Sequence, residues 1–302
     1  MSSSIILNKN NITNSENNKL TYKFPSNITF GPTDTISLSH LNIYFSWFNI
    51  SSKNNNNFFQ YKWWDNNAVL VPYDVLIPDG YYSVGDLNEF LMSVMVKNGH
   101  YLVTSVGDFG YFIEIITNAV YYSIEFRLSS LSKFMTIEGM ANNPQDITTS
   151  ENLFIGGDWA PPDNFECPQI IFPSNNKFGE LLGFEAGTTL IKDTSSDIIN
   201  KQYSILNTKV PNMDPSSSFV ITCNLVKNDM GVPNNILHSF TVPNGAQFGD
   251  LISPIDNLIY SNIKAGNYDE INLQIFDQNF NPLVILDSNM LIILSIIKNN
   301  II

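Results

Sequence analysis

Short segments with β-strand character recur toward both ends of the chain, and they constrain the fold more than any other feature. Two of them, at 36–48 and 68–77, precede the middle of the chain. The others follow residue 196, with turn residues between them, at 203–210, 219–226, 236–242, 257–263, 271–276 and 290–297. Partial alternation of apolar and polar residues, bounded by Gly, Pro, Asn and Asp, predicts strands. Eight strands are the number in the two packed four-stranded sheets of a jelly roll.

A helical pattern interrupts these segments in the middle of the chain. Its apolar residues recur at helical spacing and share one face: Leu87, Phe90, Leu91, Val94 and Met95. Ser83 can cap the start of this helix and Gly99 its end. Three β-rich runs follow at 101–106, 111–116 and 120–126. The middle of the chain is therefore predicted to be an inserted α+β subdomain.

These patterns predict a mainly β protein, a single jelly-roll β-sandwich of eight strands with an inserted α+β subdomain. The jelly roll is expected to be discontinuous, with residues 26–77 and 200–302, and the insertion to cover 78–199. Residues 1–25 are rich in Ser, Asn and Lys, a composition that does not offset the entropy of ordering. We expect a flexible N-terminal arm there.

The charge balance argues against some partners. The chain has 15 Lys and Arg against 28 Asp and Glu, a formal net charge of −13, which opposes direct binding to the phosphates of nucleic acid. The apolar segment 291–297 is far shorter than the ~20 residues of a membrane-spanning helix. Cys167 and Cys223 lie far apart in the sequence, and we expect both to be buried and reduced.

Residues that could support catalysis do not converge in the sequence. His40, His100 and His238 are isolated, and packing or surface roles are expected for all three. We therefore predict that the chain is not an enzyme and has no catalytic, cofactor-binding or metal-binding residues.

Two clusters have competing interpretations. Asp79, Asp86 and Glu89 surround the start of the predicted helix, where helix capping is favoured over catalysis or calcium binding. A second cluster is aromatic and contains Phe58, Phe59, Tyr61, Trp63, Trp64 and Tyr73. A buried sheet face is the favoured interpretation, and a platform for stacking on sugar rings is the alternative.

Several motifs resemble one known protein family. They lie at 34–38 (DTISL), 45–47 (FSW), 77–81 (IPDGY), 181–184 (LLGF), 221–226 (ITCNLV), 236–240 (ILHSF) and 271–277 (INLQIFD). In these motifs and their order the chain resembles the penton, or minor capsid, proteins of Maverick/Polinton transposons and Mavirus-like virophages. It departs from the family pattern at Asn224, at Asn281, and at Ser288 and Asn289, where the family often has Asp, Gly and an acidic residue.

The resemblance implies a structural protein of the virion, synthesised in the host cytoplasm. It implies a homopentameric penton at the five-fold vertices of an icosahedral capsid, beside a double jelly-roll major capsid protein. A host-surface receptor or glycan is a further implied partner. The alternative function is a glycan-binding jelly-roll module used in host attachment.

Overall fold

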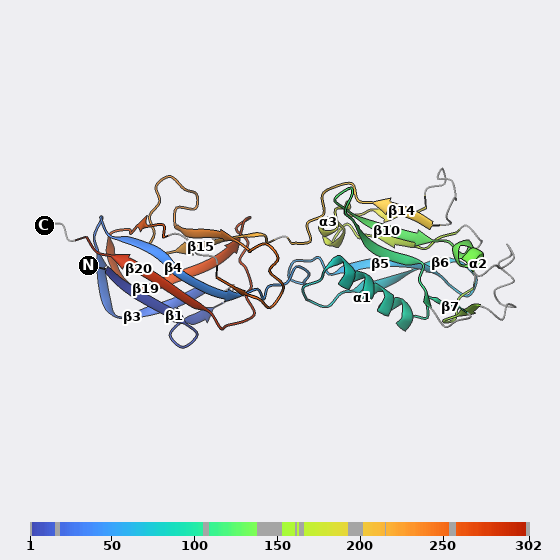
Figure 1. Ribbon diagram of the computed structural model, residues 1–302, viewed down its shortest axis with the longest axis horizontal. Helices are drawn as coiled ribbons and strands as arrows, with labels where there is room; N and C mark the ends of the chain where they lie inside the picture. Colours follow the sequence, from blue (N-terminus) through green and yellow to red (C-terminus); the bar gives the residue numbers. More distant parts are fainter. Residues whose placement is uncertain are drawn as a thin grey trace. The chain divides into compact units, whose positions relative to one another are not determined.

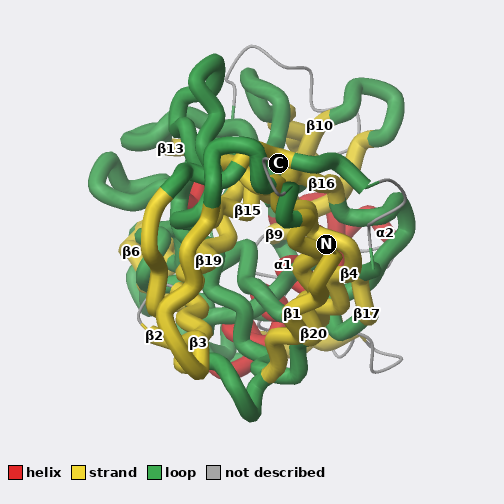
Figure 2. The backbone as a smooth tube through the Cα atoms, turned by 90° about the vertical axis from the view of Figure 1, so that its left-hand side faces the viewer, coloured by secondary structure: helices red, strands yellow, loops and turns green. Residues whose placement is uncertain are grey.

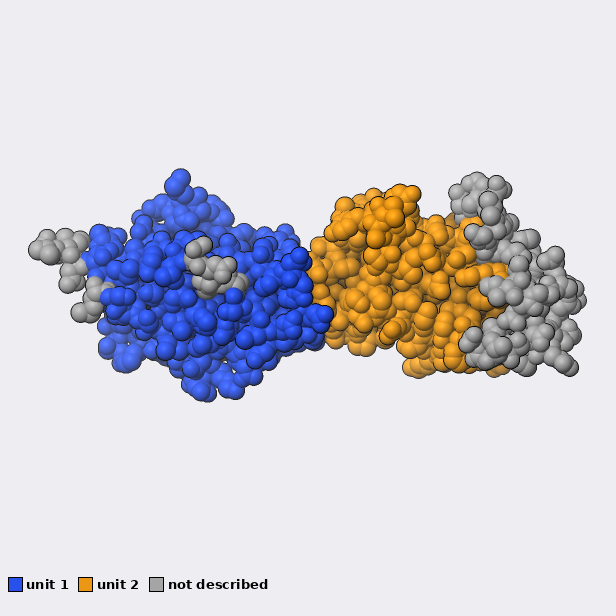
Figure 3. All heavy atoms as spheres, in the orientation of Figure 1, with its two compact units in different colours: residues 1–48, 216–302 blue, residues 49–215 orange. Residues whose placement is uncertain are grey.

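The first and last segments of the chain fold into one unit, and the middle of the chain folds into another. The computed structural model describes residues 2–15, 19–104, 109–137, 153–160, 162, 166–192, 202–214, 216–253 and 258–299. Unit 1 contains Met1–Phe48 and Ser216–Ile302, and unit 2 contains Asn49–Pro215 (Figure 3). Each unit has its own buried apolar residues.

Unit 1 consists of two antiparallel sheets, and Figure 1 labels several of their strands. Sheet 1 has the order β1 (Ser2–Asn8), β20 (Leu291–Ile297), β4 (Thr35–Tyr44) and β17 (Leu251–Ile252), and β18 (Ser261–Asn262) also pairs with β4. Sheet 2 has the order β16 (Ile236–Thr241), β15 (Ser218–Cys223), β19 (Gly266–Asp277), β3 (Lys19–Phe30) and β2 (Thr13–Ser15). Neighbouring strands therefore come from opposite ends of the chain. The mainly β prediction is confirmed.

The two sheets form separate layers with an apolar core between them (Figure 2). In β20 the buried residues alternate with half-buried ones, so that Ile292, Leu294 and Ile296 face the core. Strand β19 alternates in the same way across much of its length. Trp47, which follows β4, packs against Phe219 of β15 with ring centroids 4.7 Å apart. Period-two burial in both sheets produces this two-layer arrangement.

The N-terminal segment differs from the predicted flexible arm over 1–25. Strand β1 pairs with β20 along its whole length, from Ser2 opposite Ile297 to Asn8 opposite Leu291. Leu7 and Leu20 are fully buried. The local composition is polar, but distant strands supply both the hydrogen-bond partners and the apolar surface that order this segment. A composition argument misses such long-range pairing.

Unit 2 combines three small sheets with three helices. The sheets have the orders β14-β10-β9, β11-β7-β8 and β13-β12-β5-β6. The strands are β5 (Phe58–Trp64), β6 (Leu70–Leu76), β7 (Leu102–Thr104), β8 (Phe109–Gly110), β9 (Ile113–Asn118), β10 (Ser123–Ser129), β11 (Leu153–Ile155), β12 (Gln169–Ile171), β13 (Thr189–Leu190) and β14 (Gln202–Leu206). The helices are α1 (Val84–Lys97), α2 (Leu131–Ile137) and α3 (Phe178–Leu181).

Helix α1 confirms the helical pattern seen in the sequence. Ser83 and Asp86 form a capping box, in which the Ser83 hydroxyl accepts from the Asp86 amide and the Asp86 carboxylate accepts from the Ser83 amide. Leu87, Leu91 and Met95 are buried on one face. Gly99 has φ 74° just beyond the end of the helix, a conformation that glycine adopts without a steric penalty.

The boundary between the units differs from the predicted one. Residues 49–77, expected in the jelly roll, belong to unit 2 because β5 pairs with β6 and β12. Strand β14, also expected in the jelly roll, pairs with β10 of unit 2. The predicted second boundary at 199–200 lies outside the described residues. In unit 1, β1 and β3 take the places that were predicted for β6 and β14. The strand predicted at 257–263 is reduced to Ser261–Asn262, and the unpredicted β17 at Leu251–Ile252 pairs with β4.

The pairing of β1 can be tested with one pair of substitutions. We expect Leu7→Ala to lower the free energy of unfolding by about 2–5 kcal/mol, because it removes a fully buried side chain. Ile6→Ala is the control and should cost less than about 1 kcal/mol, because that side chain is 51% exposed. Urea unfolding and hydrogen exchange of residues 291–297 provide the measurement. Equal, small effects of both substitutions would restore the flexible-arm interpretation.

Candidate functional site

Four aromatic residues of β5 lie in the core of unit 2, whereas Phe58 and Tyr73 of the same cluster are half-buried. Phe59, Tyr61, Trp63 and Trp64 are all 0–1% exposed. Trp63 stacks on the ring of His100, with centroids 5.0 Å apart and an interplanar angle of 13°. The buried-sheet-face interpretation is therefore confirmed. A glycan platform on Trp63 and Trp64 is wrong, because neither ring can reach a sugar.

His100 is a buried group surrounded by aromatic rings. Its Nδ1 lies 2.7 Å from the Tyr61 hydroxyl, which also accepts a 2.9 Å hydrogen bond from Asn98 Nδ2. Burial lowers the pKa of His100 to about 4. The imidazole is therefore neutral near pH 7 and acts in packing, as the sequence indicated. His40 lies on β4 and His238 on β16, in unit 1.

The carboxylates at the start of α1 have structural partners. Asp86 completes the capping box, and its hydrogen bonds with Ser83 lower the pKa of its carboxyl. Asp79 accepts 2.7 Å and 3.0 Å bonds from the amide and hydroxyl of Ser52. Glu89 is exposed. The capping interpretation is confirmed for Asp86. Within the described ranges, no three His, Cys, Asp or Glu side chains are grouped to hold a metal.

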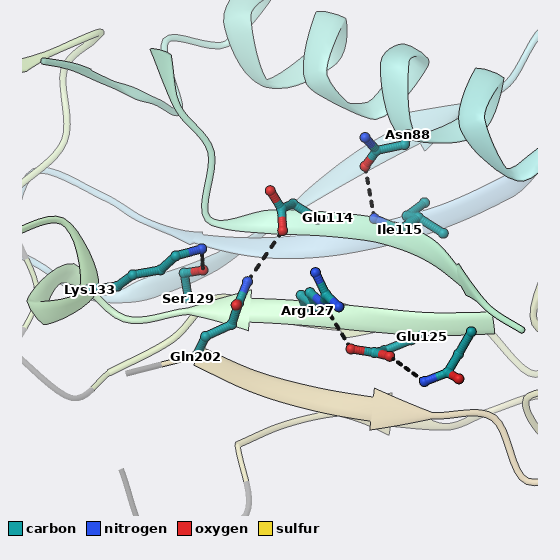
Figure 4. A network of polar contacts seen from close by, with 9 residues as sticks. Asn88, Glu114, Ile115, Glu125, Arg127, Ser129, Lys133 and Gln202 are labelled. Carbon is teal, nitrogen blue, oxygen red and sulfur yellow. Dashed lines mark hydrogen bonds and ion pairs between the residues drawn. The ribbon is translucent and has the colours of Figure 1, made fainter. Parts of the chain in front are cut away.

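A polar network that the sequence did not reveal crosses the sheet of β9, β10 and β14 (Figure 4). Arg127 is the only arginine in the chain, and its Nε donates a 2.8 Å bond to buried Glu125. Asn118 donates to the other carboxylate oxygen at 2.9 Å. Burial opposes ionisation of Glu125, but hydrogen bonds from Arg127, Asn118 and Ser204 outweigh it and lower the pKa of the carboxyl. The network joins side chains of all three strands.

Two further contacts in Figure 4 hold this sheet, one from helix α1 and one between its two outer strands. Asn88 on α1 accepts a 2.8 Å bond from the amide of Ile115, so the helix holds the edge of β9. Gln202 on β14 donates to Glu114 on β9 at 3.3 Å. These contacts stabilise the sheet and bring no nucleophile and base together.

Both cysteines are free and buried, as expected. Burial raises the pKa of the Cys167 and Cys223 thiols to about 12, so both are protonated at neutral pH. No helix in the described part of the chain is long and apolar enough to cross a membrane.

Sheet 1 has the most distinctive chemistry of the surfaces in unit 1. Its five strands contain no Asp, Glu, Lys or Arg, in a chain with a net charge of −13. Sheet 2 contains five such residues: Lys19, Lys23, Asp269, Glu270 and Asp277. A sheet face that remains in water usually carries polar and charged residues opposite the core. The outer face of sheet 1 is therefore the candidate contact surface of this protein.

The strand register determines which side chains share this outer face. Because Ile292, Leu294 and Ile296 point into the core, Ile293 and Ser295 point outward. Ile6 of β1 and His40 of β4 lie on either side of Ile293. Ser4 and Ser37 flank Ser295 in the same manner, although Ser37 itself is fully buried. Tyr44 lies opposite the exposed Leu251 of β17. The outer face thus consists of rows of Ile, Leu, Ser, Asn and Thr, with one histidine and one tyrosine.

Comparisons with known proteins give structural similarity without a sequence match. No protein-family model and no curated protein sequence matches this chain. A crystal structure of selenomethionine-labelled mavirus penton protein is similar to it, with 13% sequence identity and a TM-score of 0.43. The similarity covers 98% of this chain and 97% of that one.

The buried imidazole predicts a pH dependence of stability. The pKa of His100 is about 4 in the folded chain and near 6.5 when unfolded, so the unfolded chain binds more protons between these values. As the pH falls from 6.5 to 4, His100 should lower the free energy of unfolding by up to about 1.4 kcal/mol per pH unit. Urea unfolding at several pH values should show a smaller loss in His100→Gln. Parallel pH profiles would contradict this.

We predict that two ion pairs contribute unequally to stability, namely the partly buried Glu125–Arg127 pair and the exposed Lys227–Asp229 pair. We expect Arg127→Met to cost about 1–3 kcal/mol, because it leaves a buried carboxylate without one of its donors. Lys227→Met is the matched control. It breaks a 3.1 Å pair with Asp229 whose side chains are 52% and 75% exposed, and it should cost less than about 1 kcal/mol. Thermal unfolding would measure both, and equal losses would contradict a structural role for the network.

Proposed function

We propose that this chain is a capsid penton protein, five copies of which surround each five-fold vertex of an icosahedral particle related to virophages and Maverick/Polinton elements. The observation that carries the proposal is the strand order of unit 1. Numbered along the chain, its eight principal strands are β1, β3, β4, β15, β16, β17, β19 and β20. Sheet 1 then reads first-eighth-third-sixth, and sheet 2 reads second-seventh-fourth-fifth.

This order matches the one expected for a single jelly roll, in which two Greek keys alternate between the sheets, and it supports that fold for unit 1. The short strand β2 extends sheet 2 beside β3, and β18 lies on the same edge of β4 as β17. Neither changes the order of the eight strands. Jelly rolls occur in viral capsid proteins and in lectins. In this chain the aromatic residues suggested for sugar binding are buried, which favours the capsid role.

The family resemblance in the sequence coincides with these strands. Its motifs at 34–38, 221–226, 236–240 and 271–277 lie at or within β4, β15, β16 and β19. Unit 2 enters between the third and fourth strands of the jelly roll, after Phe48 and before Ser216. Because both sheets of unit 1 are complete without it, unit 2 is free to act as an outgrowth. We propose that it faces away from the particle.

A closed ring of five requires head-to-tail contacts, in which one surface of a copy meets a different surface of the next. In the proposed particle each penton is bordered by a double jelly-roll major capsid protein, and the outward unit is available to a host-surface receptor. The chain then acts as a structural protein, made in the host cytoplasm and located in the virion. Its role is assembly and not catalysis.

Charge is the main obstacle to this assembly. Five copies bring together about −65 formal charges, since each chain carries −13. Mutual repulsion at this charge density is reduced by salt, whose screening length is about 10 Å at 0.1 M and about 3 Å at 1 M. Salt or divalent cations should therefore favour the ring.

Sedimentation of the full chain across ionic strength tests the proposed function. We expect a species with five times the mass of one chain, and a larger fraction of it at high salt than at low salt. Native mass spectrometry gives the number of copies independently. A closed assembly of any other number would contradict the penton role. Stronger association at low salt would contradict the electrostatic account.

A further inference from the structure

We infer that the outer face of sheet 1 is the surface through which one copy of this chain contacts the next. This inference rests on the proposed function, because it assigns one of the two contact surfaces that a ring of five requires. We also assign this contact to named residues. Ile6 on the edge strand β1 lies beside Ile293 on β20, and Leu291 and Ile297 lie along β20 as well.

The first support is the combination of apolar side chains with the lack of charge. Ile6 is 51% exposed on β1 and Leu251 is 52% exposed on β17. Between these edge strands, Leu291, Ile293 and Ile297 are half-buried on β20. Cores of protein–protein contacts are depleted in charged residues and enriched in apolar ones. The outer face of sheet 1 has both properties across its strands.

The second support is the unprotected edge of β1. Within the described residues, no strand other than β20 pairs with β1, although the Asn11 side chain accepts from the Asn8 amide at 2.8 Å and donates to the Ile6 carbonyl at 2.7 Å. Proteins usually protect such edges with Lys, Pro, bulges or a covering segment. The sequence of β1, SSSIILN, has no charge and no proline, and its register with β20 is continuous. An edge of this kind is suited to being covered by another chain.

The third support is a polar atom without a partner. The side-chain oxygen of Asn42 is buried and accepts no hydrogen bond from the described part of the chain, although Asn42 as a whole is half-buried. Asn42 shares the outer face with Leu291, directly opposite it on β20. Leaving such an oxygen unpaired costs about 1–3 kcal/mol. Rotation of this amide would let a donor from a neighbouring chain pair with it.

Charge identifies the occupant as a second copy. Nucleic acid and anionic lipid headgroups require clustered Lys and Arg, and this face has neither. A basic partner would be drawn to the acidic surfaces of the chain and not to an uncharged one. Each copy carries a formal net charge of −13, so the electrostatic repulsion between two copies is smallest where the surfaces in contact carry no charge. The uncharged face is therefore suited to another copy of the same acidic chain.

Lysine substitutions test the assignment on the full chain. Ile6→Lys and Ile293→Lys place a charge at neighbouring positions of the face, whereas Val232→Lys and Val120→Lys add the same charge at side chains that are 96% and 86% exposed elsewhere. We expect each face variant to weaken self-association at least about tenfold, and the controls to change it less than about threefold. Sedimentation equilibrium at one fixed salt concentration gives the association constants, with circular dichroism as the check on folding.

The outcomes separate this inference from the proposed function. A folded face variant that assembles like the wild type overturns the inference and leaves the penton role intact. An assembly of some other number that only the face variants weaken supports the inference and contradicts the penton role. Equal weakening by all four substitutions overturns the inference, because added charge would then act regardless of position. A wild type that stays monomeric at every concentration and salt overturns both.

A labelling experiment covers the case in which a lysine prevents folding. Ser4→Cys places a thiol at an exposed position on the same face, and Ser93→Cys places one at an exposed position on α1. Both native cysteines are buried and should react slowly. We expect assembly to slow maleimide modification of Ser4→Cys at least about fivefold and to leave Ser93→Cys unchanged. Equal rates for Ser4→Cys in dilute and assembled protein would overturn the inference.

Discussion

The pairing of β20 with β1 and β4 is the interaction on which the rest of unit 1 depends. It joins residues 2–8 and 35–44 to residues 291–297, so the sheet exists only when both ends of the chain meet. Sheet 2 repeats this arrangement through the pairing of β3 with β19. Closing such a long loop costs conformational entropy, and this cost is offset only when the contacts form. We therefore expect unit 1 to fold slowly. The strand pairs of unit 2 lie within residues 49–215, so closing its loops costs less conformational entropy.

The two units use different chemistry for stability. Unit 2 is built around aromatic rings, and Trp63 alone contacts the rings of Trp64, His100, Phe112 and Trp159. Unit 1 relies mainly on aliphatic residues that alternate along its strands, with a smaller aromatic contact between Trp47 and Phe219. Because sheet 1 has no charged residues, the negative charge of the chain resides on sheet 2, on the loops and on unit 2. This separation gives an acidic protein one surface at which copies can meet.

Local patterns predicted some elements well. The apolar spacing around Leu87 and Leu91, with Ser83 before it, was sufficient to predict α1, because helix periodicity and capping are local properties. The same holds for β15, β16 and β20, whose turn residues lie nearby. Burial of the β5 aromatics also followed from the sequence, because large rings gain most from leaving water.

Features that depend on distant partners were not predictable in this way. Strand β1 has few apolar residues, and its order comes from β20 at the other end of the chain. The position of the unit boundary depends on whether β5 and β6 pair with unit 2, and their sequences are suited to either sheet. Arg127 stands out in composition, but only the register of β10 places it beside Glu125 and opposite Glu114. The uncharged face of sheet 1 likewise required knowledge of which strands are neighbours.

The most direct test of the account is an electron cryomicroscopy reconstruction of the protein assembled in solution. We expect a five-fold ring in which unit 1 of each copy has the two-sheet strand order described above, with the outer face of sheet 1 against the adjacent copy. A ring with another symmetry, or one in which that face points into solvent, would contradict it.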